Sequence, residues 1–154
     1  GRIKTLVASK HAIERELKQA DLVIGAVLIH GAKAPKLVSN GLVATMKSGS
    51  VLVDIAIDQG GCFEDSRPTT HAEPTFSVHN SIFYCVANMP GAVPVASTYA
   101  LTNATLPYAL SLANDGWKVA CAKDPNLAKG VNIHEGQIYY AAVSEAHGYP
   151  SVEL

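Results

Sequence analysis

Apolar residues follow two different periods along the first half of the chain. From about His11 to Ala20 they gather on one helical face, which predicts an amphipathic helix. The runs Leu22–Ile29 and Val51–Ile57 are instead apolar on both faces, as is typical of strands buried in a parallel sheet. A short helix is expected between them, at about Asn40–Lys47. This order predicts an open α/β sheet in which the two runs are neighbouring parallel strands.

The later part of the chain changes from strand patterns to helix patterns. Two short strands are expected around Phe76–Val78 and Ile82–Val86, and one long helix from about Ser97 to Asn114. We expect Gly116 to end this helix, and Pro107 to kink it or to mark a restarted helix. Two short helices complete the prediction, at about Pro125–Lys129 and Tyr140–His147.

The composition is that of a globular chain without a strong charge preference. Of 154 residues, 48% are apolar and 16% are charged, and the formal net charge is −1. Acidic and basic residues are interspersed, so the charge pattern favours neither nucleic acid nor an anionic membrane as a partner. No stretch approaches the roughly 18 apolar residues of a membrane span, and the first residues lack the apolar region of a signal peptide. We therefore expect a soluble, cytoplasmic protein.

The cysteines and histidines predict no disulfide framework and no metal site. Cys62, Cys85 and Cys121 are widely spaced and odd in number, which argues against paired disulfides and against structural zinc. Cys85 lies in an apolar run and is expected to be a core residue. The histidines are scattered, without the spacing of a metal-binding pair.

Three segments change from apolar to polar or small residues where a predicted strand ends. They are 27–31, 54–61 and 86–90. Ligands of open α/β sheets bind beyond the carboxyl ends of the strands, so these segments are candidates for the rim of one cofactor pocket. The alternative is that they form the ordinary strand ends of any α/β domain.

Asp58 is the candidate for chemistry at this rim. It closes the second predicted strand and opens onto Gly60 and Gly61, where glycines allow close approach of a ligand to the backbone. A carboxylate there could orient an imidazole or stabilise positive charge beside a nicotinamide. The alternative is a turn aspartate that caps its own loop. Asp54, inside the strand, is interpreted as structural.

Asn88 and Met89 are candidates for binding a ring. A carboxamide that donates and accepts, next to a polarizable apolar side chain, suits an uncharged planar ring that carries an amide. The alternative is a simple turn before Pro90.

Several sequence signatures of nucleotide-binding and hydrolytic enzymes do not occur in the chain. It contains no G-x-G-x-x-G dinucleotide fingerprint, no P-loop and no G-x-S-x-G element. Either the domain is smaller than a complete nucleotide-binding fold, or its first half is missing.

Long and specific runs along nearly the whole chain point to one family. They are Ala20–Leu28, Gly31–Val38, Val53–Gly61, Arg67–His71, Cys85–Pro90, Ser97–Thr105 and Gly116–Trp117. These runs resemble the carboxy-terminal half of the alanine dehydrogenase and pyridine nucleotide transhydrogenase family. The resemblance implies the second half of a Rossmann-type, doubly wound parallel sheet, followed by helices that complete a substrate domain. Residues 1–93 would then belong to the NAD-binding domain and residues 94–154 to the substrate domain.

The resemblance also implies an activity and a set of site residues. The activity is the reversible, NAD-dependent oxidative deamination of L-alanine to pyruvate and ammonia by an oxidoreductase. The counterpart of Asp58 in the family is catalytic and works with a histidine that would precede this chain. The residues implied to contact NAD are Val27, Leu28, Ile55, Ala56, Ile57, Asp58, Arg67, Val86, Ala87, Asn88 and Met89. The family implies a homo-oligomer, a hexamer, and we expect the long helix to expose more apolar surface than this chain can cover.

Some family features do not carry over to this sequence. Ser111 and Asp115 stand where a glutamate and a histidine bind metal in some members, so no metal site is implied. His30 replaces a usual proline. The glycine fingerprint and the substrate-binding residues would precede Gly1, so the isolated chain is expected to be inactive. The alternatives are the NAD-binding domain of a transhydrogenase-type protein and a non-catalytic dinucleotide-binding or assembly module.

Overall fold

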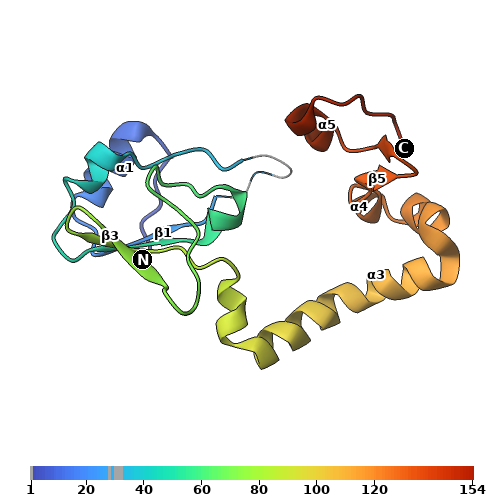
Figure 1. Cartoon of the computed structure of the whole chain (residues 1–154), viewed down its shortest axis with the longest axis horizontal. Coiled ribbons are helices and arrows are strands. Elements are labelled where there is room, and N and C mark those ends of the chain that lie inside the picture. The colour runs from blue at the N-terminus through green and yellow to red at the C-terminus, as the bar shows by residue number, and fades with distance from the viewer. Residues whose placement is uncertain (1, 28, 30–32) are drawn as a thin grey trace. The chain divides into compact units, whose positions relative to one another are not determined.

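The computed structural model describes residues 2–27, 29 and 33–154. The predicted site residue Leu28, and His30, lie outside the described residues. The chain forms two compact units: the first comprises the described residues of Gly1–Ile29 together with Lys33–Met89, and the second comprises Pro90–Leu154. Figure 1 shows a sheet with short helices in the first unit and mainly helices in the second.

The first unit contains a sheet with the strand order β1-β2-β4-β3. Its strands are β1 (Leu22–Gly25), β2 (Val51–Asp54), β3 (Thr75–Val78) and β4 (Ser81–Tyr84). The central β2 pairs in parallel with β1 and with β4, and β3 returns antiparallel to β4 as a hairpin. Leu22 lies opposite Val51, and Gly25 lies opposite Asp54. The predicted α/β architecture with neighbouring parallel strands is therefore confirmed.

Two capped helices and a loop bury one face of the sheet. In α1 (Lys10–Leu17) the Ser9 hydroxyl accepts a hydrogen bond from the Ala12 amide at 3.2 Å, and in α2 (Asn40–Val43) Ser39 caps the first turn in the same way. The serine caps satisfy amides that have no partner inside the helix. The core on this face is one cluster, whose large members include Leu17, Val43, Leu52, Phe63 and Phe83.

The opposite face of the sheet differs from the prediction. Both runs were expected to be buried on two faces. In the first run Leu22 and Ile24 each expose 57% of their surface, whereas Val51 and Val53 of the second run are half-buried. Ile82 of the neighbouring strand β4 exposes 39%. Alternation along a strand places these side chains on the face away from the core cluster. The sequence pattern correctly marks an apolar face, but none of the described elements of the first unit covers it.

The strands also end earlier than predicted. The expected strands Leu22–Ile29 and Val51–Ile57 stop at Gly25 and at Asp54. After Asp54 the chain turns into a 3-10 helix, η1 (Ile55–Gln59), which Gly60 ends with a φ of +90°. An apolar run reports burial but not backbone conformation, so the helical turn looked like a continuing strand.

The second unit is mainly helical. Its elements are η2 (Met89–Ala92), α3 (Pro94–Lys123), α4 (Pro125–Ala128), β5 (Ile133–His134), β6 (Gln137–Ile138) and α5 (Ala141–His147), with η2 beginning at the last residue of the first unit. The two predicted short helices are confirmed as α4 and α5. The β5–β6 hairpin, which no sequence signal indicated, turns at Gly136 with a φ of +78°.

The long helix α3 breaks at Gly116 and not at Pro107. Gly116 has a φ of 72° and a ψ of 160°, and it is the residue of α3 with non-helical angles, whereas the helix continues through Pro107. Figure 1 shows the ribbon changing direction near the end of α3. Apolar side chains along it are exposed, among them Val95, Tyr99 and Leu106, at 71%, 68% and 54%. The predicted excess of apolar surface on this helix is therefore present. None of the described helices is long and apolar enough to cross a membrane.

Candidate functional site

Three parallel strands end at the same edge of the sheet. Gly25 pairs with Asp54, the last residue of β2, and Val53 pairs with Tyr84, the last residue of β4. The chain leaves this edge three times, after β1, after β2 and after β4. These are the three segments that the sequence singled out, so the topology starts them side by side.

A cavity of about 430 Å³ opens where the first two of these segments leave the sheet. It is lined by Ala26, Val27, Ile55, Ala56, Asp58 and Gln59. The structure thus brings together four of the predicted site residues: Val27, Ile55, Ala56 and Asp58. Ile57 is only 3% exposed and belongs to the core cluster, so its side chain is turned away from the cavity. The volume falls within the range of small-molecule sites, and the walls are mostly apolar.

Asp58 contributes the carboxylate of this cavity. It lies in η1, not at the end of a strand as predicted, and its side chain is exposed. Among the described residues no backbone amide donates to this carboxylate, so it does not cap the turn that follows. An acidic group at the border of an apolar cavity can stabilise a cation that develops there.

Asp54, in contrast, is fully buried directly before η1. Its carboxylate accepts hydrogen bonds from the Cys62 amide at 2.9 Å, from the Phe63 amide at 3.4 Å and from the Ser66 hydroxyl. These contacts close the loop from η1 to Ser66 on itself. The interpretation of Asp54 as structural agrees with this geometry.

Two cysteines lie next to this buried carboxylate. Burial, and secondarily the charge of Asp54, raises the pKa of Cys62 to about 12. Burial also raises the pKa of Cys85, which is fully buried as the sequence predicted. Both are free thiols, and in this setting they are neutral packing groups and not nucleophiles.

Gly61 is required by this internal packing. A side chain at Gly61 would place its Cβ 2.6 Å from the Ser66 Cβ and 2.7 Å from the Asp54 carboxylate, and its φ is +75°. We predicted that the two glycines would expose backbone to a ligand. The structure shows that Gly61 makes room for the buried carboxylate and that Gly60 provides the positive φ that ends η1. The close approach of a ligand to this backbone stays a prediction.

Two residues that hold the rim were not identified from the sequence. The Lys36 ammonium donates to the carbonyl oxygens of Gly60 at 2.7 Å and of Phe63 at 2.9 Å. The side-chain amide of Gln59 donates to the Ile29 carbonyl at 3.0 Å and accepts from the Ile29 amide at 3.4 Å. Both contacts join segments far apart in sequence, and no local pattern signals them.

The third segment adjoins the loop that contains Arg67. Val86 is buried and forms a parallel bridge with Thr69, Ala87 is half-buried, and Asn88 is exposed with a φ of 63°. The Asn88 carbonyl lies 3.0 Å from His71 Nε2. Asparagine is among the residues that tolerate this left-handed conformation, so a turn before Pro90 is present.

The remaining predicted residues lie apart from the cavity lining. The Arg67 guanidinium stacks 4.1 Å above the Phe76 ring, and Met89 begins η2. None of the residues Arg67, Val86, Ala87, Asn88 and Met89 lines the cavity described above. Their part in a site thus stays a prediction.

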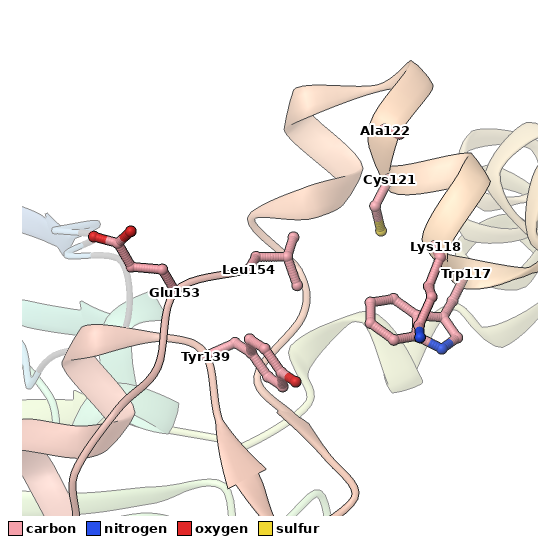
Figure 2. A pocket seen from close by; sticks show the side chains of 7 residues that line it. All are labelled: Trp117, Lys118, Cys121, Ala122, Tyr139, Glu153 and Leu154. Atoms are coloured by element: carbon pink, nitrogen blue, oxygen red, sulfur yellow. The ribbon is translucent and has the colours of Figure 1, made fainter.

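A separate cavity of about 420 Å³ lies within the second unit. Figure 2 shows its lining side chains, Trp117, Lys118, Cys121, Ala122, Tyr139, Glu153 and Leu154. Trp117 also packs edge-on against His134, with ring centres 4.5 Å apart. The centre is aromatic and aliphatic, and the described lining brings no acid–base pair together, so this cavity suggests no chemistry.

The chain is similar to known proteins over most of its length. The family model described as alanine dehydrogenase/PNT, C-terminal domain, matches residues 1–141. The alanine dehydrogenase of Mycolicibacterium smegmatis is 66% identical over 145 residues, which cover 94% of this chain and 39% of that protein. The alanine dehydrogenase of Mycobacterium tuberculosis is 63% identical over 153 residues, 99% of this chain and 41% of that protein.

Solved structures give the same result for the fold. An L-alanine dehydrogenase superposes with a TM-score of 0.80 at 47% identity, covering 96% of this chain and 40% of that one. A transhydrogenase from Sinorhizobium meliloti superposes with a TM-score of 0.53 at 27% identity, covering 58% of this chain and 25% of that one.

Three conclusions follow from these comparisons. The α/β architecture is of the Rossmann type predicted from the sequence. The chain spans about two-fifths of the length of the curated relatives that it matches. With the family model matching residues 1–141, the chain belongs to the alanine dehydrogenase/PNT family, in its C-terminal domain.

Proposed function

We propose that this chain is the carboxy-terminal part of an NAD-dependent alanine dehydrogenase. The reaction is the reversible oxidative deamination of L-alanine to pyruvate and ammonia. One observation carries the proposal: the cavity at the ends of β1 and β2 combines apolar walls with the Asp58 carboxylate, in a chain 66% identical to an alanine dehydrogenase. Residues 1–93 would contribute to the NAD-binding domain and residues 94–154 to the substrate domain.

The residues of the cavity suit one end of the cofactor. Val27, Ile55 and Ala56 offer apolar surface to the faces of a nicotinamide ring. The cavity volume of about 430 Å³ fits such a ring better than a whole dinucleotide. Bound NAD would supply the hydride acceptor. The proposed role of Asp58 is to stabilise the positive charge of the substrate nitrogen, or of an imidazolium partner, in a site from which water is excluded.

The other proposed NAD contacts are less direct. Ile57 would contribute through its backbone, because its side chain is in the core. The segment of Val86, Ala87, Asn88 and Met89, with Arg67 on the neighbouring loop, starts from the same sheet edge. Leu28 follows Val27 directly in the sequence. We propose that these residues complete the cofactor site.

A transhydrogenase-type function has weaker support. The likeness to the transhydrogenase covers 58% of this chain, whereas the likeness to the L-alanine dehydrogenase covers 96%. The dehydrogenase likeness therefore extends into the second unit, where a substrate domain is proposed. A non-catalytic module would give no turnover at all, so an assay separates the three functions.

The proposed assembly is a homo-oligomer, a hexamer by family resemblance, in the cytoplasm. The exposed apolar side chains of α3 support an assembly, because apolar side chains gathered on one exposed helix are typical of an interface.

The test is a steady-state assay of the full-length parent protein. We expect NADH to form from NAD when L-alanine is added, and to be consumed when pyruvate and ammonia are supplied. D-alanine and L-lysine are the controls for the substrate. Hydride exchange between NADH and an NADP analogue without amino acid would favour the transhydrogenase. Absence of NADH formation, NADH consumption and hydride exchange would contradict the proposal that the protein is an enzyme.

A further inference from the structure

We infer that Gln59 is a positioning residue of the cofactor cavity. Its side-chain amide pairs with the backbone of Ile29 and so joins the segment after β2 to the segment after β1. This inference rests on the proposed function, because it explains how the two walls of the proposed nicotinamide site stay in register. Gln59 and Asp58 both line the cavity, and so does Val27. Ile29, which is not among the lining residues, follows Val27 by two positions in the sequence.

The pairing begins where the sheet stops. The ladder between β1 and β2 ends at the pair Gly25–Asp54, so the backbone beyond Gly25 has no strand partner in β2. Gln59 replaces that partner: its Nε2 donates to the Ile29 carbonyl at 3.0 Å, and its Oε1 accepts from the Ile29 amide at 3.4 Å. One side chain thereby satisfies both the backbone N–H and the backbone C=O of Ile29, as a neighbouring strand would.

The main chain of Gln59 adds a second connection. Its carbonyl accepts a hydrogen bond from the Ala34 amide at 3.0 Å. Gln59 therefore contacts the chain both at Ile29 and at Ala34, on either side of residues 30–32. The loop after η1 is itself held by hydrogen bonds to Asp54 and to Lys36. Gln59 therefore joins Ile29 and Ala34 to a part of the chain that is fixed by several contacts.

Only a carboxamide of this length can make the pair. Its donor and its acceptor are both needed, and a glutamate carboxylate offers acceptors alone. A protonated glutamic acid, however, regains one donor next to its carbonyl and has nearly the same shape. Two charged residues accompany Gln59 in this region: Asp58, which lines the same cavity, and Lys36, which donates to the Gly60 carbonyl.

The test uses Gln59→Glu and Gln59→Met in the full-length parent protein, with Gln19→Glu and Gln19→Met as matched controls. Gln19 is an exposed glutamine just after α1, on the same unit and outside the cavity. NADH affinity is measured by fluorescence titration at about pH 8 and at about pH 4.5, close to the ordinary pKa of a glutamate carboxyl. Each variant is reported relative to the wild type at the same pH, so that effects common to both proteins cancel.

We expect Gln59→Met to weaken NADH binding roughly tenfold at both pH values, the loss of about one net hydrogen bond to a positioned backbone. Gln59→Glu should be as weak at the higher pH, and should recover at least threefold relative to the wild type as the pH falls toward the ordinary pKa of a glutamate carboxyl. A purely structural role would not give acid-dependent recovery. The Gln19 variants should stay within about twofold of the wild type.

Two results would overturn the inference: NADH affinity of Gln59→Met within about twofold of the wild type, or a loss in Gln59→Glu that is the same at both pH values. Amide hydrogen exchange of the peptide containing Ile29 and Ala34 tests the pairing without any ligand, and it should be faster in Gln59→Met. If the wild type binds no NADH, the proposed function fails, and the exchange rate still decides whether Gln59 holds this segment.

Discussion

Asp58 and Asp54 are four residues apart and have opposite environments. Asp58 is exposed at the border of an apolar cavity, and Asp54 is fully buried with backbone and hydroxyl donors. The same side chain therefore serves to hold a loop at one position and is free to act on a ligand at the other. Their different roles follow from solvation and from hydrogen-bond partners, not from residue type.

Substitution of Asp58 tests its catalytic role. Asp58→Asn keeps the size and removes the charge, so turnover of L-alanine should fall by something on the order of 100-fold while NAD affinity changes little. Steady-state kinetics and cofactor titration of the full-length protein measure both. Asp21→Asn is the control, since Asp21 forms an exposed ion pair with Lys47 at 2.8 Å. Turnover of Asp58→Asn close to the wild type would return Asp58 to the role of an ordinary loop residue.

Gly61 allows the packing around Asp54 to be measured as stability. Gly61→Ala forces a Cβ to within 2.7 Å of the Asp54 carboxylate at a φ of +75°, so the free energy of unfolding should fall by about 2 kcal/mol or more. Gly41→Ala is the matched control: Gly41 lies in α2 with nothing within 4 Å of its added Cβ, and helix propensity favours alanine there. Urea unfolding of both variants decides the matter, and equal stabilities would contradict the described packing.

Helix α3 owes its change of direction to one glycine. The φ of 72° and ψ of 160° at Gly116 are accessible almost only to glycine, so Gly116→Ala should lower the free energy of unfolding of this unit by roughly 1–3 kcal/mol. Trp117 is the single tryptophan of the chain and follows the break directly, so its fluorescence reports the thermal transition. Ser111→Ala, in the regular part of the same helix, should leave the transition nearly unchanged. An unaltered transition in Gly116→Ala would show that the break carries no strain for alanine.

The elements were predictable where the signals are local. The short helices α4 and α5 and the helix breaker Gly116 depend on signals within a few residues, and the structure has them where expected. The predicted length of β2 was wrong, because the hydrogen bonds that Asp54 accepts where η1 begins come from residues eight to twelve positions later. The Gln59–Ile29 pairing spans 30 residues, and periodicity carries no information over that distance.

The two open apolar surfaces belong to different units of the molecule. One is the face of the sheet with Leu22 and Ile24, and the other is α3 with Val95, Tyr99 and Leu106. A sheet is normally covered on both faces when its strands are parallel. We therefore expect these surfaces to be covered by further polypeptide, whether from the remainder of a longer protein or from other subunits.

Charge placed on α3 tests the assembly directly. In the full-length protein, Leu106→Asp together with Leu110→Asp should reduce the molar mass in light scattering to that of a smaller species, because a buried unpaired carboxylate costs several kcal/mol at an interface. Lys129→Asp, at the exposed end of α4, is the control for the change of charge. An oligomer of unchanged mass in the double variant would place the interface elsewhere.

The buried thiols make the opening of the loop around Asp54 measurable. Cys62 and Cys85 are fully buried, and the pKa of Cys62, about 12, leaves almost no thiolate at neutral pH. An alkylating reagent can therefore react with them only during moments when the loop from η1 to Ser66 swings out and the thiol meets water. The labelling rate of these two cysteines thus measures how often this loop opens, and a ligand that binds in the cavity lined by η1 should lower that rate.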